Sequence, residues 1–497
     1  MDTGSGSGPC VQFLDPVPDM LNSAGNDVTT SKETLATKGT PVTAIAADGA
    51  ARVVLRIPAN KANERLKITL ADDFGRNDRP ADEVGTLIST LDGTSANPLE
   101  VEAVRTTQGP LAFATYRAPR DFSRSSARQY DDQAAFRFVS FQVESEDVQD
   151  FSSAPSLNIM RPPVVLVHGL WDSPSLWGNF LLGDQRFQIA LANYNIPLNG
   201  QISLQGTVPF YPLWILNQKA NANQLGFAYN APAVLTQIGD AIRDFRSYNQ
   251  AAAAQADVVA HSMGGVVTRW AETLPEFNDK YSFAIGNIHK LITVGTPHFG
   301  SPFAAQLLQD SCLQYELAKR GQIAFGASVV LGQGTPGSQI VSGAVYDLQG
   351  DADGTGGGLS PALNTLKNGS GHGVPAAQIA GQMTDEVNLA SLTPLSSAFV
   401  EAVCLGASPL GSKLTRAGWP TIFNGNASDA IVSVTSQLAS QTAAGGNVFP
   451  NVVHASSLSK LGLTGPAEID PQSGILPAVI NLLNAPSSGD SFHPLPQ

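Results

Sequence analysis

Charged residues, cysteines and long apolar runs are all scarce in this chain of 497 residues, and each scarcity excludes some structural or functional classes. No apolar run reaches the roughly 18 residues that a membrane-spanning helix needs, so we expect no transmembrane segment. The net charge of -13, without a basic cluster, excludes nucleic acid and anionic membranes as expected partners, because phosphate binding needs concentrated Lys and Arg. Three cysteines allow at most one internal disulfide.

The pairing of the cysteines is left open by the sequence. Cys312 and Cys404 fall in the same predicted domain, where they form either a disulfide or two small buried thiols. Cys10 has the position of a lipoprotein cysteine, but no apolar stretch precedes it, and this disfavours lipidation.

The composition is that of a globular protein, with 42% apolar and 14% charged residues in a chain long enough for two or three domains. Residues 1–9 have neither the basic nor the apolar region of a signal peptide. The low charge and the abundance of Gly, Ser, Asn and Thr nevertheless predict a secreted, extracellular protein whose signal peptide is not visible in this chain.

Short stretches of alternating polarity dominate residues 1–156, which we predict to form an all-β domain. Their period of two, with turn residues between them, favours a small antiparallel sandwich of the immunoglobulin-like kind. No metal-ligand cluster marks a site in these strands, so a folding or spacing module is favoured over carbohydrate or surface binding. The predicted strands cover residues 52–57, 66–70, 99–104, 111–116 and 136–143.

Apolar strands alternate with amphipathic helices in residues 157–497, which predicts an α/β domain with a mostly parallel, doubly wound sheet. A connector at 151–161 precedes the run Val164–Val167, which is apolar on both faces as a central parallel strand should be. Further strands are predicted at 256–260, 290–295 and 376–381, and helices at 174–183, 230–245, 266–270, 396–404 and 475–483.

Glycine-rich loops break this alternation between residues 302 and 372, where we expect a lid or binding loops. Within them, Asp351 and Asp353 resemble the start of a calcium loop. The later ligands of an EF-hand are missing, so a solvated turn is favoured.

An apolar strand ending at Ala260, a serine at position 262 and an amphipathic helix that begins at once predict a nucleophile elbow. Ser262 must then lie at a strained turn of positive φ, which projects its Oγ above the sheet and requires small neighbours such as Ala260 and Gly264. The alternative is a helix that merely begins at a serine cap. The strand and the small flanks together disfavour it.

Ser262, Asp429 and His454 occur in the order nucleophile, acid and base that the elbow arrangement requires. A serine hydroxyl needs a base to remove its proton, and a third group must orient that base. An Asx-turn role is the alternative for Asp429. The main-chain N–H groups of Leu170, after the first strand, and Met263, after the nucleophile, are the predicted oxyanion donors.

His454 is predicted as the base by comparison with the other histidines. Those in motif turns are expected to orient backbone, His289 is expected at the surface, and the remaining two lie before the acid or in the C-terminal tail. The motif-turn histidines are His168, His261 and His298, and the last two are His372 and His493.

Four motifs together resemble the α/β-hydrolase lipases, and they are Val165–Leu170, Ala260–Gly265, Val294–Ser301 and Asp429–Val432. The chain is similar in particular to bacterial lipases and to the lipase-like domain of glycosylphosphatidylinositol deacylases. The resemblance covers roughly residues 160 to 460. It implies hydrolysis of carboxylic esters through an acyl-enzyme, with no organic cofactor; no metal ligands are predicted, and the sequence leaves bound calcium open. Ala260 and Ala430 stand where such families often have glycine.

The sequence therefore predicts a serine lipase or carboxylesterase acting on an ester or lipid with an apolar acyl part, dissolved or at an interface. One alternative is an extracellular polyester depolymerase whose N-terminal sandwich helps to hold an insoluble polymer. Another is a catalytically silent adhesion or scaffold protein that keeps the hydrolase fold. The complete Ser, Asp and His set counts against this second alternative.

Overall fold

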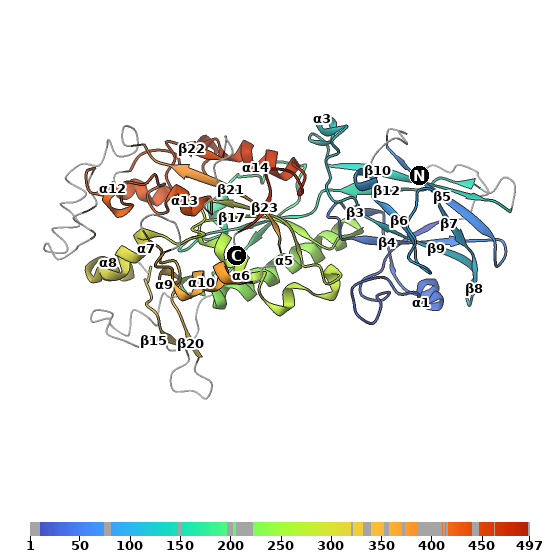
Figure 1. The fold of residues 1–497 in the computed structure, drawn as a ribbon, viewed down its shortest axis with the longest axis horizontal. Coiled ribbons are helices and arrows are strands. Elements are labelled where there is room, and N and C mark those ends of the chain that lie inside the picture. The colour runs from blue at the N-terminus through green and yellow to red at the C-terminus, as the bar shows by residue number, and fades with distance from the viewer. Residues whose placement is uncertain are drawn as a thin grey trace.

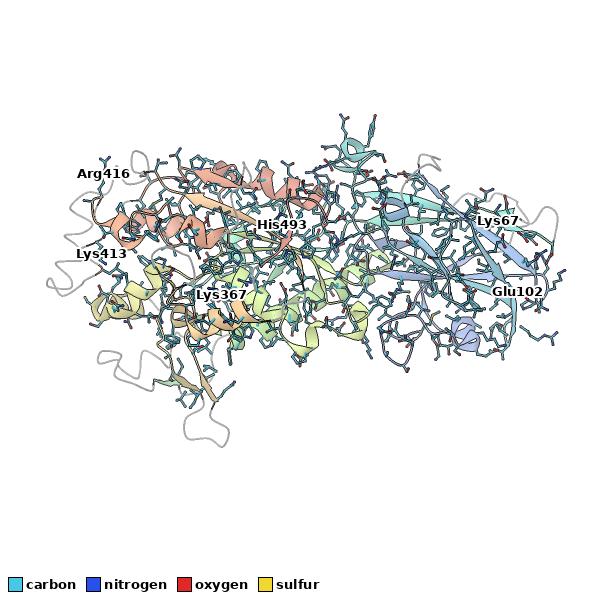
Figure 2. The ribbon with its side chains drawn as sticks, viewed as in Figure 1. Lys67, Glu102, Lys367, Lys413, Arg416 and His493 are labelled. Carbon is cyan, nitrogen blue, oxygen red and sulfur yellow. The ribbon has the colours of Figure 1, made fainter. Side chains whose placement is uncertain are left out.

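Figure 1 shows the computed structural model, with two β-sheets of the N-terminal part at one end and a mixed α/β part at the other. The structure describes residues 10–73, 81–147, 152–195, 202–204, 222–319, 322–331, 339–351, 357–369, 373–384, 410, 413, 416–439, 447–461 and 463–495. Charged side chains lie at both outer ends, as the labelled Glu102 and Arg416 illustrate (Figure 2). Within the described ranges, no helix is long and apolar enough to cross a bilayer.

The N-terminal part consists of two sheets that enclose a common apolar core. One sheet has the strand order β2-β1-β4-β9-β6 with β8 beside β9, and the other has the order β16-β3-β12-β10-β5-β7 with β11 beside β10. Pairing is antiparallel except where β3 meets β12 and β16. The predicted strands are confirmed except that the one at 99–104 is divided between β7 and β8, which lie in different sheets, and the immunoglobulin-like assignment stays a prediction. The bounds are β1 Gln12–Asp15, β2 Thr40–Pro41, β3 Ala44–Ala46, β4 Arg52–Pro58, β5 Arg65–Asp72, β6 Thr86–Ser89, β7 Leu99–Glu102, β8 Val104–Thr106, β9 Gly109–Arg117, β10 Phe136–Ser145, β11 Ser152–Ser153, β12 Ser156–Met160 and β16 Ala251–Ala252, with short helices α1 Lys32–Thr37, α2 Ala81–Val84 and α3 Arg128–Asp131.

Strand β10 shows why these segments form a two-layered core. Its residues alternate between the interior and the outer face, so that Val139, Phe141 and Val143 are fully buried while Phe136 and Phe138 are exposed. Each such buried side chain contributes on the order of 1.5–3 kcal/mol of burial free energy. The alternation of polarity in the sequence therefore indicates a strand with one face packed against the core and the other exposed to solvent.

The C-terminal part is built on a parallel sheet with the strand order β14-β13-β17-β18-β21-β22, to which β23 adds an antiparallel pairing with β21. One face of the sheet packs against helices α5 and α6, and the other face packs against α14. Because both faces are covered, Val164–Val167 is apolar throughout, as predicted. The bounds are β13 Val164–Val167, β14 Ile189–Ala192, β17 Ala256–His261, β18 Ile288–Val294, β21 Pro375–Gln382, β22 Val448–Pro450, β23 His493–Pro494, α5 Phe227–Asn249, α6 Met263–Ala271 and α14 Ile475–Asn484.

The region predicted to hold a lid, 302–372, contains short helices and the strands β19 and β20, which form a small antiparallel sheet with β15 from the earlier segment 202–204. Residues 352–356, in which most of the calcium-like stretch falls, and the helix predicted at 396–404 lie outside the described residues. The remaining bounds are α7 Pro302–Gln309, α8 Ser311–Lys319, α9 Ala344–Asp347, α10 Pro361–Asn368, α12 Trp419–Ile422, α13 Val434–Gln437, β15 Ile202–Leu204, β19 Val329–Leu331 and β20 Gln339–Val341, with 3-10 turns η1 Pro174–Trp177, η2 Ala222–Gln224, η3 Pro275–Phe277, η4 Lys280–Ser282, η6 Ser456–Leu461 and η7 Pro471–Ser473.

Two predicted elements differ from the structure. The helix expected after Ser173 is only the 3-10 turn η1, because Gly178 ends it with a φ of 44° and Leu181 adopts a φ of 60°. The helix expected to begin at Asn230 begins earlier, at Phe227, since a buried carboxylate oxygen of Asp347 accepts the Phe227 N–H and caps it.

The connector predicted at 151–161 is wrong, because Ser156–Met160 forms β12 inside the N-terminal sheet. The alanine-rich segment after α5 also reaches that sheet, as β16 pairs in parallel with β3. Asp48 lies fully buried at this junction and accepts hydrogen bonds from the backbone N–H groups of Ala254 and Gln255. The N-terminal sheets and the α/β part therefore share backbone hydrogen bonds.

The cysteines differ in state. Cys10 is free and exposed, whereas Cys312 is disulfide-bonded. Cys404, with which a pairing was considered, lies outside the described residues.

Candidate functional site

Ser262 occupies the sharp turn between β17 and α6, with φ 55° and ψ -131°. A Cβ at Gly264 would lie 2.5 Å from the carbonyl oxygen of His168 and 2.7 Å from that of Val167, so any larger residue there collides with backbone. The serine is therefore held in a conformation that non-glycine residues rarely adopt, between neighbours that must be small. This is the local geometry that the sequence predicts for position 262.

The structure brings Ser262, His454 and Asp429 together in one hydrogen-bonded chain. The His454 Nε2 lies 2.7 Å from the Ser262 Oγ, and the His454 Nδ1 lies 2.8 Å from the Asp429 Oδ2. In addition, the backbone N–H of His454 donates to the Asp429 carbonyl at 2.9 Å. A base therefore lies within hydrogen-bond reach of a hydroxyl, with a carboxylate on its other ring nitrogen.

The Asp429 carboxylate makes the contacts of both roles weighed for it. Its Oδ1 accepts the backbone N–H groups of Ile431 and Val432 at 2.8 and 2.7 Å, which is an Asx-type turn, while Oδ2 contacts His454. Ala430, inside this turn, has a φ of 89°. The related families often have glycine here, and a positive φ is the conformation in which glycine is favoured.

The segments that carry the predicted oxyanion donors both adjoin Ser262. Met263 is the first residue of α6, so its N–H has no acceptor within the helix. Leu170 follows Gly169, whose Cβ, if present, would lie 2.7 Å from the Ser262 Cβ. The loop after β13 thus runs directly against the serine.

Two buried side chains that the sequence analysis missed hold this loop. Asn223 accepts the Trp171 N–H at 2.7 Å and donates to the Gly169 carbonyl at 3.0 Å, and the Tyr194 hydroxyl donates to the His168 carbonyl at 2.5 Å. Both residues are fully buried. Neither belongs to a sequence motif, and they are separated from the loop by more than twenty residues, so no local signal pointed to them.

A second carboxylate, also missed, reaches the same imidazole. The Glu468 Oε2 lies 3.3 Å from the His454 Nδ1 and 3.0 Å from the His261 Nε2. Glu468 is fully buried, and its Oε1 accepts the Gly381 N–H at 3.1 Å. The sequence carries no sign of this contact, because Glu468 lies in an irregular segment beyond the predicted base.

The charges of this cluster are strongly coupled. Burial lowers the pKa of His454, but the negative charges of Asp429 and Glu468 outweigh burial and raise it to about 10. Burial raises the pKa of Asp429 to about 6, against the lowering effect of His454. Burial likewise acts to raise the pKa of Glu468, yet His454 and His261 hold it at about 2. Glu468 therefore has the lower pKa of the two carboxyls, and the negative charges of both favour the imidazolium form of His454.

The other histidines take structural positions. His289 is buried, contrary to prediction, since it lies in a strand covered on both faces, and its Nδ1 lies 2.8 Å from an oxygen of Asp257. His298 contacts Arg269 and Thr293, as part of the turn after β18. His372 lies outside the described residues. None of the described ones reaches the Ser262 Oγ, apart from His454.

One group of side chains in the described part of the chain has the spacing of metal ligands. It consists of His261, His454 and Glu468, whose ligand atoms lie within 4.8 Å of one another. These atoms already form hydrogen bonds and ion pairs within the serine site, so we assign no metal to them.

One protein-family model matches the segment that contains the elbow. Residues 227–315, from α5 into α8, are similar to the PGAP1-like alpha/beta domain, and this segment is well under half of the chain. No curated protein sequence matches the chain.

The solved structures similar to this chain include lipases and a phospholipase. The mature Bacillus licheniformis lipase BlEst2 is 15% identical, with 65% of this chain and 91% of that chain covered and a TM-score of 0.34. Staphylococcus hyicus lipase is 11% identical, with 65% and 93% covered and a TM-score of 0.29. Phospholipase PlaB from Legionella pneumophila is 14% identical, with 55% and 45% covered and a TM-score of 0.30. The resemblance stated from the motifs agrees with the family match over residues 227–315.

Proposed function

We propose that this protein is a serine ester hydrolase that cleaves carboxylic esters with an apolar acyl part. The observation that carries the proposal is the continuous hydrogen-bonded chain from the Ser262 Oγ through His454 to Asp429, on a strained elbow. Strain of this kind persists only where the surrounding structure enforces it, and it clusters at active sites. An extracellular location and action at a lipid interface are part of the proposal, and they come from the sequence.

In the proposed mechanism, Ser262 attacks the ester carbonyl while His454 takes the hydroxyl proton through Nε2. Asp429 holds the imidazole in the tautomer whose Nδ1 carries a proton, and it stabilises the imidazolium that forms. The N–H groups of Leu170 and Met263 donate to the oxyanion of the tetrahedral intermediate. His454 then protonates the leaving alcohol, and a water molecule activated by the same base releases the acid from the acyl-enzyme.

Substitution of the nucleophile tests this proposal. Ser262→Ala removes the attacking oxygen, so we expect turnover of a chromogenic short-chain ester to fall by at least about 10⁴-fold and labelling by a fluorophosphonate probe to disappear. The exposed Ser247→Ala on α5 is the matched control and should keep both signals. Folded wild-type protein that neither turns over esters nor takes the label would favour the silent scaffold alternative instead.

A further inference from the structure

The buried Glu468 carboxylate lies against the Nδ1 side of His454, in a space that exists only because two neighbouring residues are glycines. A Cβ at Gly295 would collide with its Oε2, and a Cβ at Gly381 would lie 2.5 Å from its Oε1. Both glycines lie at the carboxyl ends of the central strands β18 and β21. The absence of side chains at these two positions thus makes room for the Glu468 carboxylate at the carboxyl ends of the strands.

The hydrogen bonds around Glu468 define which atom carries each proton. The His261 Nε2 faces two oxygens, the Glu468 Oε2 at 3.0 Å and the His454 carbonyl at 3.2 Å. An oxygen without a proton can only accept, so Nε2 of His261 is the donor. Glu468 is therefore an acceptor on this side, and its Oε2 also faces the Nδ1 of His454 at 3.3 Å.

Asp429 and Glu468 are supported by separate parts of the chain. The Asp429 side chain is held by its own turn, whereas Glu468 is held by the Gly381 N–H and by His261. The backbone N–H of Glu468 donates to the carbonyl of Val453, beside the base. Loss of one carboxylate therefore leaves the support of the other in place.

We propose that Glu468 is a positioning residue for His454, acting as a second carboxylate acceptor for the Nδ1–H and sharing with Asp429 the stabilisation of the imidazolium. This inference rests on the proposed function, because it assigns His454 the role of the base. The titratable groups that face His454 are Asp429, Glu468 and His261, and no charged side chain of another packed element in the described ranges reaches it. The serine site is thus a tetrad with two acids.

A double-mutant cycle tests the tetrad, with Asp429→Ala, Glu468→Gln and the double variant. In a triad with one acid, replacing that acid lowers kcat by about 10⁴-fold. With Glu468 in place, we expect Asp429→Ala to lose only about 10- to 100-fold, Glu468→Gln to lose about 3- to 30-fold, and the double variant to fall by about 10⁴-fold. A folded Asp429→Ala variant that loses about 10⁴-fold, as a triad with one acid would, overturns the proposal, and this result decides even if Glu468→Gln does not fold.

The pH profile separates positioning from a merely structural role. Removing the charge of Glu468 disfavours the imidazolium, so the pKa of His454 falls and the base is neutral at lower pH. The acid limb of kcat/KM in Glu468→Gln should therefore move to lower pH by about one unit. An unmoved limb in a folded variant would contradict the proposal.

Glu272→Gln is the matched control, because Glu272 is another buried glutamate and burial raises its pKa to about 8. It is largely protonated near neutral pH, so the amide replaces it closely, and we expect neither activity nor the acid limb to change.

Titration of His454 by NMR in the Ser262→Ala background makes the inference independent of turnover. A lower His454 pKa on adding Glu468→Gln supports the contact even if the wild type hydrolyses no ester, in which case only the proposed function fails. An unchanged His454 pKa refutes the contact.

Discussion

The residues that do the proposed chemistry and those that hold them in place differ in how they are encoded. Ser262 and Gly264 lie in a local motif, since the elbow is a steric problem solved within a few residues. Asn223 and Tyr194 act on the same site from distant segments, by hydrogen bonds to three carbonyl or N–H groups of the loop after β13. At the residue scale, the sequence therefore predicted the reacting groups and missed their supports.

Asn223 should contribute to turnover through the loop that it holds. Asn223→Ala removes both hydrogen bonds to the Gly169–Trp171 loop, so the Leu170 N–H loses its fixed position and kcat should fall by about 10- to 100-fold, with KM within about threefold. Steady-state kinetics on a soluble ester measure both constants. The exposed Asn26→Ala serves as control, and a folded Asn223→Ala with wild-type kcat would remove the loop from the mechanism.

At the scale of elements, burial decided which segments became strands. The sheet strands β13, β17 and β18 are buried along their whole length because helices cover both sides, and in β13 this is readable in the sequence as an uninterrupted apolar run. Strand β12 was read as a connector because its alternation is short and polar at its exposed positions. Strand β16 was also not predicted, because a strand of two residues has no recognisable alternation and exists only because β3 lies beside it.

Asp48 is expected to hold these elements together. Its two oxygens accept four backbone N–H groups, from Ala50, Ala51, Ala254 and Gln255. Asp48→Ala leaves these buried donors without an acceptor, at about 1–3 kcal/mol each before relaxation, so urea denaturation should show a loss of at least about 3 kcal/mol. Asp48→Asn keeps part of the acceptor capacity and should lose less, whereas the exposed Asp19→Ala should stay within about 0.5 kcal/mol. Equal stability of Asp48→Ala and wild type would show that the junction does not depend on this carboxylate.

At the scale of the whole molecule, the N-terminal sheets and the α/β part are joined by more than the chain. Arg246 on α5 forms an ion pair with Asp15, and the Arg120 side chain donates to the Ser487 hydroxyl at 3.0 Å. Ala252 and Ala254 are buried in the core of the N-terminal sheets although they lie in the α/β half of the sequence. The division at residue 156 remains a prediction, and these contacts argue for one cooperative unit.

A chain that begins at residue 161 should therefore be unstable. It lacks β3 and β12, so β16 loses its partner and Ala252 and Ala254 become exposed. We expect aggregation in size-exclusion chromatography, or a Tm at least about 10 °C below that of the full chain in differential scanning fluorimetry. A monomeric product with the full-length Tm would show that the α/β part folds alone.

The polymer-holding role proposed for the N-terminal part is for this reason better tested by point substitution. Phe136 and Phe138 are exposed side by side on β10, and their replacement leaves the core untouched. Turnover on a polyester film, compared with a soluble ester, is the relevant measurement.

The sequence by itself determined the elbow, the order Ser262, Asp429, His454 and the two kinds of sheet, because steric demands at a turn and the periodicity of burial are local properties. Only the tertiary structure decided that Glu468 reaches His454, that Asn223 and Tyr194 hold the donor loop, and that His289 is buried. These contacts join residues far apart in the chain. Local periodicity holds no record of which distant segments will meet, so their partners become visible only when the fold is complete.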